Sequence, residues 1–263
     1  MAWSRGSLVT LAFYLALSGC ASLPAGEQRD TDDPLEPLNR AVFDTNGKLD
    51  DAFIRPLAEA YRAAVPEFVR DRIRSVFDNL AEPRIFANDV LQRRADAAAI
   101  TLGRFAVNSV AGVGGMFDVA TAKGLPRQTG DFGQTLSTFG VPSGPYLVLL
   151  FFGPSNFRDA LGLGVDLFTT PPALWLTGNT GAWINFGVGT IDGMDLRSRN
   201  IETLDEIKAS ALDYYANLKS LDEQKRAAEI REANGGKEAP EELTDPGAPA
   251  SAPAPPPPPP HPE

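Results

Sequence analysis

The feature that most constrains the fold is a long stretch with almost no charge, from Phe132 to Gly189. Its 58 residues include only three charged side chains, which are Arg158, Asp159 and Asp166. Glycine and proline interrupt it throughout, and its longest fully apolar run, Tyr146 to Phe152, has seven residues. A transmembrane helix needs roughly 20 consecutive apolar residues. The stretch therefore predicts several short elements and argues against a conventional membrane span.

Two interpretations of this stretch follow from its composition. It is either the buried core of a soluble domain, or a set of short helices that lie within a membrane. In the second case, neighbouring segments or a water-filled cavity must satisfy the backbone polar groups, because lipid cannot. Composition alone does not choose between the two interpretations.

The N-terminus has the pattern of a bacterial lipoprotein signal. Arg5 supplies a positive charge, and Leu8 to Leu17 form a short apolar segment. The sequence Leu-Ser-Gly-Cys that follows has the small-residue pattern of a lipobox, in which the cysteine sulfur is acylated and becomes the first residue of the mature protein. Cys20 is the only cysteine in the chain, so no disulfide can form within it. We expect residues 1–19 to be removed and Cys20 to be the lipid anchor, and Ala21 after it favours the outer membrane.

The composition divides the remaining chain into three parts. Residues 20–31 are small, polar or charged and are expected to form a tether. Residues 32–234 are long enough for one domain, and their pattern is mostly helical. Residues 235–263 are rich in proline, with six in succession from Pro255 to Pro260. Such a tail cannot bury a core and is expected to be disordered.

Apolar periodicity predicts several helices within the domain. One begins at Pro66, and we expect Pro83 to end it, because proline lacks the amide donor that a helix interior needs. Further helices are predicted from about 84 to 92 and from 96 to 110, the latter closing at a glycine cluster. A charged helix with one apolar stripe is predicted over 201–221.

The residue inventory argues against an enzyme. The only histidine, His261, lies in the proline-rich tail, so no serine or cysteine triad can draw a histidine from the folded domain. The same shortage leaves only carboxylates as zinc ligands. No glycine-rich nucleotide-binding motif is present, and the net charge of −10 argues against binding to nucleic acid. We therefore expect no catalytic residue, no metal and no cofactor.

Three stretches of the chain resemble the VacJ/MlaA family of outer-membrane lipoproteins. The first is Asp-Pro-Leu-Glu-Pro-Leu-Asn-Arg at 33–40, which continues to Phe-Ile-Arg-Pro at 53–56. The second runs from Arg104 through Asn108 to 112–118, and the third comprises 131–136, 144–146 and 152–159. Their order and spacing cover about residues 33–221. The sequence departs from the family at Leu150, where a proline is usual, and at 44–48, which is shorter and less aromatic.

The resemblance implies a fold, a location and a function. The fold is mainly α: short helices form a ring with a central amphipathic channel, embedded in the periplasmic leaflet of the outer membrane beside a trimeric porin. This favours the membrane interpretation of the uncharged stretch. The implied function is removal of mislocalised phospholipids from the outer leaflet, which maintains lipid asymmetry. The phospholipids then pass to a soluble periplasmic carrier of the MlaC type.

Six residues are candidates for the channel or its gate. The segment around Asn46 corresponds to a region that the family links to gating. Gly112, Gly114 and Gly115 form either a flexible turn beside the channel or a simple helix stop. Arg158 and Asp159 either pair at the level of the channel or cap a helix.

The alternative function is that of a structural lipoprotein that docks other proteins of the cell envelope. In that case the proline-rich tail and the charged helix over 201–221 are the working parts. Deletion of the residues after Gly236 separates the two functions, because transport requires only the folded domain.

Overall fold

The computed structural model describes residues 33–169 and 179–235. The chain divides into two units, Met1–Pro34 and Leu35–Glu263, and every helix and strand below belongs to the second. Three predicted features lie outside the described residues: the signal peptide, the tether with Cys20, and the proline-rich tail from residue 236 onward.

A long helical segment opens the second unit. Helix α2 spans Glu36–Leu49 and has Pro37 in its first turn, where the missing amide hydrogen costs nothing. A π-helical turn, η1 (Asp50–Ile54), connects it to α3 (Arg55–Ala64).

Helix α4 spans Glu67–Leu91 and runs through Pro83. The prediction that Pro83 ends one helix and that another begins at residue 84 is therefore wrong. Proline removes one backbone hydrogen bond, but α4 packs along α5 (Ala95–Val110). In addition, Glu82 beside the proline accepts a buried hydrogen bond of 2.8 Å from Arg104 on α5. This tertiary packing outweighs the local preference of proline.

The middle of the chain consists of short elements, as the uncharged stretch predicts. These are α6 (Val119–Ala122), α7 (Phe132–Thr138), the antiparallel strands β1 (Tyr146–Leu149) and β2 (Gly153–Asn156), and α8 (Phe157–Thr169). In the strand pair, Tyr146 lies opposite Asn156. Asp118 and Asp131 cap α6 and α7, because each carboxylate accepts a backbone N–H three residues later.

Three helices complete the unit: α10 (Asn179–Arg199), α11 (Ile201–Ser210) and α12 (Tyr214–Ala233). The prediction of one helix over 201–221 is wrong, because the backbone is extended at Ala211 and at Asp213. Asp213 then caps α12 by accepting the amide of Ala216 at 3.0 Å. Arg40 of α2 donates two hydrogen bonds to the same carboxylate, at 3.1 and 2.7 Å, and so fixes the corner between α11 and α12.

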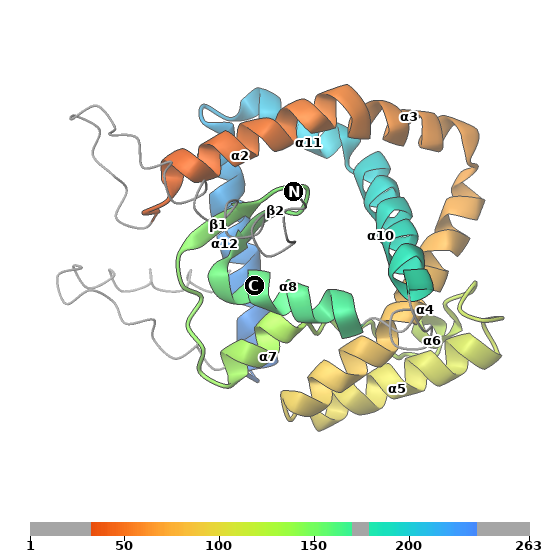
Figure 1. Ribbon diagram of the computed structural model, residues 1–263. Helices are drawn as coiled ribbons and strands as arrows, with labels where there is room; N and C mark the ends of the chain where they lie inside the picture. Colours follow the sequence, from red (N-terminus) through yellow and green to blue (C-terminus); the bar gives the residue numbers. More distant parts are fainter. Residues whose placement is uncertain (1–32, 170–178, 236–263) are drawn as a thin grey trace, which may run out of the picture. The chain divides into compact units, whose positions relative to one another are not determined.

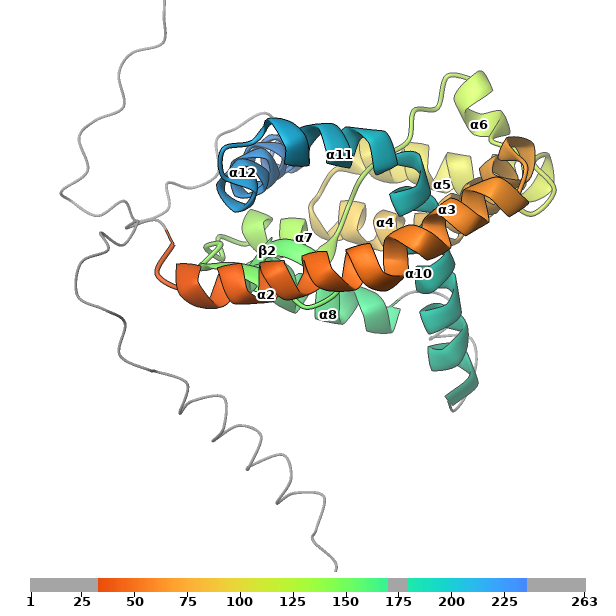
Figure 2. The ribbon, with the colours of Figure 1, turned by 90° about the horizontal axis from the view of Figure 1, so that it is seen from above.

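The elements of the second unit close into a ring, which we define by its packing contacts. Helix α2 continues through η1 into α3; α3 packs on α10, α10 on α4, α4 on α7, α7 on α8, α8 on the strand pair, and β1 on α2 (Figure 1). Helices α11 and α12 lie on one side of this ring, and the first turns of α10 project on the other (Figure 2). The mainly α fold in a single domain is confirmed.

The burial of side chains departs from the usual pattern, in which large apolar residues are inside. One small apolar cluster joins Tyr146 and Val148 of β1 to Tyr215 of α12. The largest fully buried side chains, however, are polar, beginning with Arg104, Gln134 and Glu82. Many aromatic side chains are exposed, among them Phe53, Phe68, Phe139, Phe151, Phe152, Phe168, Trp183 and Phe186. No helix in the described ranges is both long and apolar enough to cross a membrane.

Candidate functional site

A cavity of about 520 Å³ is bounded by α4, the start of α7, β2, α8, α10 and α12. Elements from different parts of the ring, together with α12, therefore line one shared cavity. Nine of the thirteen lining residues are ionisable, which is unusual for a small-molecule pocket. These nine are Arg84, Asp131, Asp159, Asp166, Asp192, Asp222, Lys225, Arg226 and Glu229.

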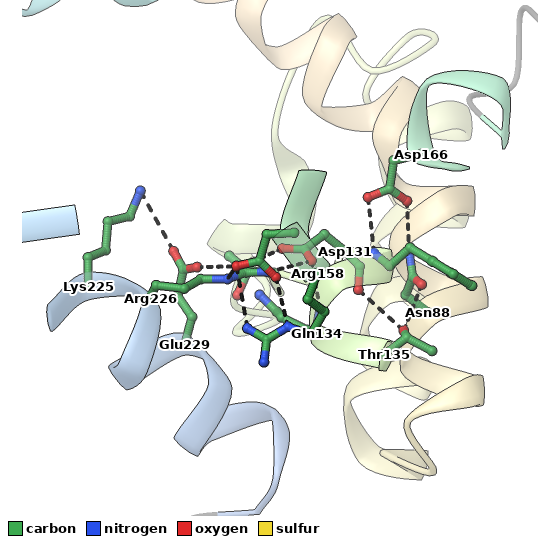
Figure 3. Close-up of polar contacts among 12 residues, drawn as sticks. Asn88, Asp131, Gln134, Thr135, Arg158, Asp166, Lys225, Arg226 and Glu229 are labelled. Atoms are coloured by element: carbon green, nitrogen blue, oxygen red, sulfur yellow. Dashed lines mark hydrogen bonds and ion pairs between the residues drawn. The ribbon is translucent and has the colours of Figure 1, made fainter. Parts of the chain in front are cut away.

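Arg226 of α12 is the centre of the main charged cluster in this cavity (Figure 3). Its guanidinium donates to Asp159 through Nε at 2.7 Å and through Nη2 at 2.8 Å. It also donates to Asp131 through Nη1 at 2.7 Å and through Nη2 at 2.9 Å. Two bidentate contacts from one arginine fix both the distance and the orientation of α12 relative to α7 and α8.

Burial and hydrogen bonding act in opposite directions on these two carboxyl groups. Burial is the largest influence and by itself raises the pKa of Asp131 and of Asp159. The hydrogen bonds and positive charge of Arg226 outweigh it, so the pKa of each group is lower than its ordinary value. Both groups are therefore ionised at neutral pH.

Two glycines allow α7 and α8 to approach closely enough to form this cluster. A Cβ atom at Gly162 of α8 would overlap the backbone of Gly133 in α7. A Cβ atom at Gly133 would overlap the carboxylate of Asp159 and the guanidinium of Arg226. The sequence therefore places small residues where two helix backbones and an ion pair meet.

A second polar cluster joins α8 to α4 and α7 (Figure 3). Asp166 of α8 accepts the backbone amide of Phe132 at 3.0 Å and the side-chain amide of Asn88 at 3.4 Å. Arg84 of α4 makes an ion pair with Asp166 at 3.0 Å, and Thr135 of α7 donates to Asn88 at 2.8 Å. Three segments far apart in sequence are thus connected around the wall of the cavity.

The comparison with known protein families decides which family this is. A sequence profile described as "MlaA lipoprotein" matches residues 31–229. The chain belongs to the MlaA lipoprotein family. The resemblance seen in the sequence motifs is therefore confirmed.

Named relatives and a solved structure agree with this family. "Intermembrane phospholipid transport system lipoprotein MlaA" of Escherichia coli K12 is 33% identical over 231 residues, which are 86% of this chain and 88% of that protein. The protein of the same name from Haemophilus influenzae is 30% identical, over 80% of this chain and 88% of that protein. A solved structure described as "Structural basis for maintenance of bacterial outer membrane lipid asymmetry" has a TM-score of 0.66 and 31% identity, covering 77% of this chain and 100% of that chain.

In this MlaA-family chain, the predicted pair Arg158 and Asp159 is formed, with Nε to Oδ1 at 3.0 Å. Asp159 lines the cavity, whereas Arg158 is buried behind it and also contacts the carbonyl of Val141. The sequence left open whether Arg158 and Asp159 cap a helix. In the structure Asn156 has this position, and its side-chain oxygen accepts the amide of Asp159 at 2.9 Å.

Asn46 holds the strand pair against α2. Its side chain donates to the carbonyl of Leu149 at 2.9 Å and accepts the amide of Phe151 at 3.0 Å. Asn39, two turns earlier on α2, likewise donates to the carbonyl of Tyr146 and accepts the amide of Val148. Asn46 is not among the residues that line the 520 Å³ cavity, and its role as a gate stays a prediction.

Gly112, Gly114 and Gly115 lie in a turn after α5 that is closely packed at Gly112 and Gly115 and open at Gly114. A Cβ atom at Gly112 would overlap backbone atoms of Asn108 and Phe117, and one at Gly115 would overlap Asn79. Gly114 and Gly115 also have positive φ angles, of 70° and 90°. None of the three lines the 520 Å³ cavity, and a role beside a channel stays a prediction.

Several cavity residues were missed by sequence reasoning. Arg226, Asp192 and Asp222 lie in a region rich in charges of both signs, where nothing local distinguishes an inward residue from a solvated one. Asp131 begins the third family motif, which was a usable signal. No group of three or more histidine, cysteine, aspartate or glutamate side chains in the described part of the chain is arranged to hold a metal ion.

Proposed function

We propose that this chain is an outer-membrane lipoprotein that removes mislocalised phospholipids from the outer leaflet through the cavity inside its ring. The observation that carries the proposal is that polar side chains are enclosed and large apolar side chains are exposed, which is the reverse of the usual distribution in a soluble domain. The cavity is lined mostly by charged groups, while large aromatic side chains on several elements of the domain are exposed. The family relatives named as lipoproteins of an intermembrane phospholipid transport system support the same activity.

A polar passage addresses the main energetic obstacle to such transport. A phospholipid carries a charged phosphate, and moving a charge into hydrocarbon costs several kcal/mol or more. Charged and hydrogen-bonding groups along the cavity replace the water that the head group loses. The acyl chains stay in contact with apolar surface, which the exposed residues of α8 and α10 supply.

Anchoring and delivery complete the proposal. Acylated Cys20 would hold the domain at the periplasmic leaflet, because two or three acyl chains give stable membrane attachment. The exposed aromatic residues would then contact lipid, as short uncharged elements do when neighbours satisfy their backbones. We further propose a trimeric porin as the partner in the membrane and a soluble periplasmic carrier of the MlaC type as the acceptor.

The test measures outer-leaflet phospholipid in cells that lack the gene, using a membrane-impermeant reagent for amino head groups. We expect accumulation without the gene and correction by the wild-type chain. Cys20→Ala should fail to correct it, because the domain is no longer held at the membrane. A truncation after Gly236 should correct it, since transport needs only the folded domain.

Two results would count against transport. An outer leaflet that is unchanged by loss of the gene would refute lipid removal. Failure of the truncation after Gly236, with the chain present at the normal level, would favour the docking function instead. Release of fatty acid or lysophospholipid by the purified chain would show an enzymatic activity.

A further inference from the structure

Helix α11 lies beside the part of the ring that η1 and α3 form, which we call the arc (Asp50–Ala64) (Figure 1). A row of three ion pairs joins the two segments. These pairs are Lys208–Asp51 at 3.2 Å, Asp205–Arg55 at 2.7 Å and Glu202–Arg62 at 2.6 Å. The residue numbers fall along α11 as they rise along the arc, so the two segments run antiparallel with their charges in register.

The contacts that hold α11 against the arc are mostly exposed. All six side chains of the row are 34–64% exposed. Ile201 is the one buried residue among the ten of α11, whereas α12 buries four residues and α5 buries five. Exposed ion pairs contribute little to stability and are weakened by salt. An element with few buried apolar contacts opens more easily than the rest of a fold.

The segments on both sides of α11 are attached more firmly than α11 itself. Before it, Arg197 of α10 donates two hydrogen bonds to Asp50, both at 2.8 Å, and this arginine is only 11% exposed. After it, Tyr215 of α12 is buried in the apolar cluster with β1. The backbone is extended at Ala211, between α11 and α12. Helix α11 can therefore leave the arc as a unit while its neighbours stay in place.

We propose that α11 is a latch on the ring, held by this row of ion pairs, and that it undocks from the arc as ionic strength rises. In the docked state Glu202 and Asp205 hold α3, and Lys208 holds η1, so α11 spans the junction of η1 with α3. π-Helical turns such as η1 are rare and frequently occur at functional sites. Undocking removes the brace from this junction and lets the arc bend there. The latch does not depend on lipid passage.

Apolar packing is the alternative way to hold α11 in place. Leu204 and Ile207 are half-buried, beside the buried Ile201. Simple salts screen exposed ion pairs, whereas only denaturing salts weaken apolar contacts. Sodium chloride therefore distinguishes the two ways of holding the helix.

The experiment measures amide hydrogen exchange of the full chain in about 0.1 M and about 1 M sodium chloride, where the Debye length falls from about 10 Å to about 3 Å. Peptides from α11 and η1 report on the latch, and peptides from α5 and α12 are internal references. Asp205→Asn with Lys208→Gln removes two pairs of the row without changing the net charge. The matched control, Glu206→Gln with Lys123→Gln, also keeps the net charge and changes exposed residues that do not belong to the row.

We expect exchange in α11 and η1 to become faster by about threefold or more in high salt, because each exposed pair contributes a factor of about 1.4 to 5. Exchange in α5 and α12 should keep its rate. The variant without two pairs should exchange fast already in low salt and respond little to added salt, and the control should behave like the wild type.

Four results would count against the latch. Exchange in α11 that does not respond to salt would show that apolar contacts hold it. A full salt response in the variant Asp205→Asn with Lys208→Gln would show that the row is not the cause. Faster exchange in α5 and α12 together with α11 would mean that the whole fold opens rather than one helix. Faster exchange in α11 with unchanged exchange in η1 would refute the brace on the arc.

Discussion

At the scale of single residues, Arg226 has the most consequences. It holds α12 to α7 and α8 through two carboxylates, and its side chain is only 16% exposed. Arg226→Met leaves Asp131 without this cation, while Asp159 keeps Arg158. We expect a loss of about 2–4 kcal/mol of unfolding free energy, somewhat below the range for fully buried pairs because Asp131 is partly exposed.

Denaturant unfolding and amide exchange along α12 measure this loss. The control is Lys225→Met, on the adjacent residue, whose ion pair is longer and more exposed and should contribute under about 1 kcal/mol. Equal effects of the two substitutions would show that Arg226 is an ordinary surface charge.

The pH dependence of the same variant has a definite sign. In the wild type, the lowered pKa of Asp131 and Asp159 means that their stabilising contribution is complete above the ordinary aspartate pKa. It is lost only as pH falls through the lowered value. Without Arg226, burial raises the pKa of Asp131, so its penalty grows as pH rises. The stability gap between wild type and variant should therefore narrow on acidification through the ordinary aspartate range; a gap independent of pH would contradict this electrostatic account.

The sequence singled out Asp159 of this cluster, but neither Asp131 nor Arg226. Asp159 is one of three charges in a long uncharged stretch and therefore stands out locally, whereas Asp131 appeared only as the first residue of a family motif. Arg226 has charged neighbours of both signs in every direction along the chain. Only the position of α12 in the folded domain shows that Arg226 faces the cavity.

At the scale of elements, glycines decide how closely helices pack. Gly162 and Gly164 lie two residues apart in α8 and have the same helical backbone. A Cβ atom at Gly162 would overlap α7, whereas one at Gly164 meets nothing within 4 Å. Gly162→Ala should destabilise the fold by about 1–3 kcal/mol through overpacking, and Gly164→Ala should stabilise it by about 0.5–1 kcal/mol through helix propensity.

Thermal or denaturant unfolding of the two variants gives this comparison directly. Loss of stability in both, or in neither, would mean that the close contact between α7 and α8 is not what Gly162 provides. With a photoreactive amino acid in place of Leu163 in the reconstituted chain, lipid cross-linking should fall in Gly162→Ala, because α8 can no longer hold its position.

Element boundaries were predictable only where local signals were strong. The predicted helix start at Pro66 was accurate, because Pro66 is the residue before Glu67, the first residue of α4. Pro83 failed as a stop signal because the contact of α4 with α5 compensates for the lost hydrogen bond. The break near Ala211 was missed because the apolar stripe continues across it, although the backbone does not.

At the scale of the whole domain, the uncharged composition of residues 132–189 is explained by where their side chains lie. A long uncharged stretch would suggest a buried core, yet many of its aromatic residues are exposed while polar residues are buried. The ring and its charged cavity depend on contacts between elements far apart in sequence. Composition alone left open whether this stretch is a buried core or lies within a membrane. The family resemblance predicted a mainly α domain, and that fold is confirmed.

The central claim is that phospholipid passes through the cavity, and blocking it is the most direct measurement. Leu163→Trp with Leu167→Trp adds bulk to two lining positions of α8. Leu161→Trp with Val165→Trp adds at least as much bulk to accessible positions of that helix which do not line the cavity. We predict that, at equal protein levels and unchanged helical content, the first variant leaves phospholipid in the outer leaflet of cells lacking the wild-type gene, while the second clears it. Full clearance by the cavity variant would contradict the account.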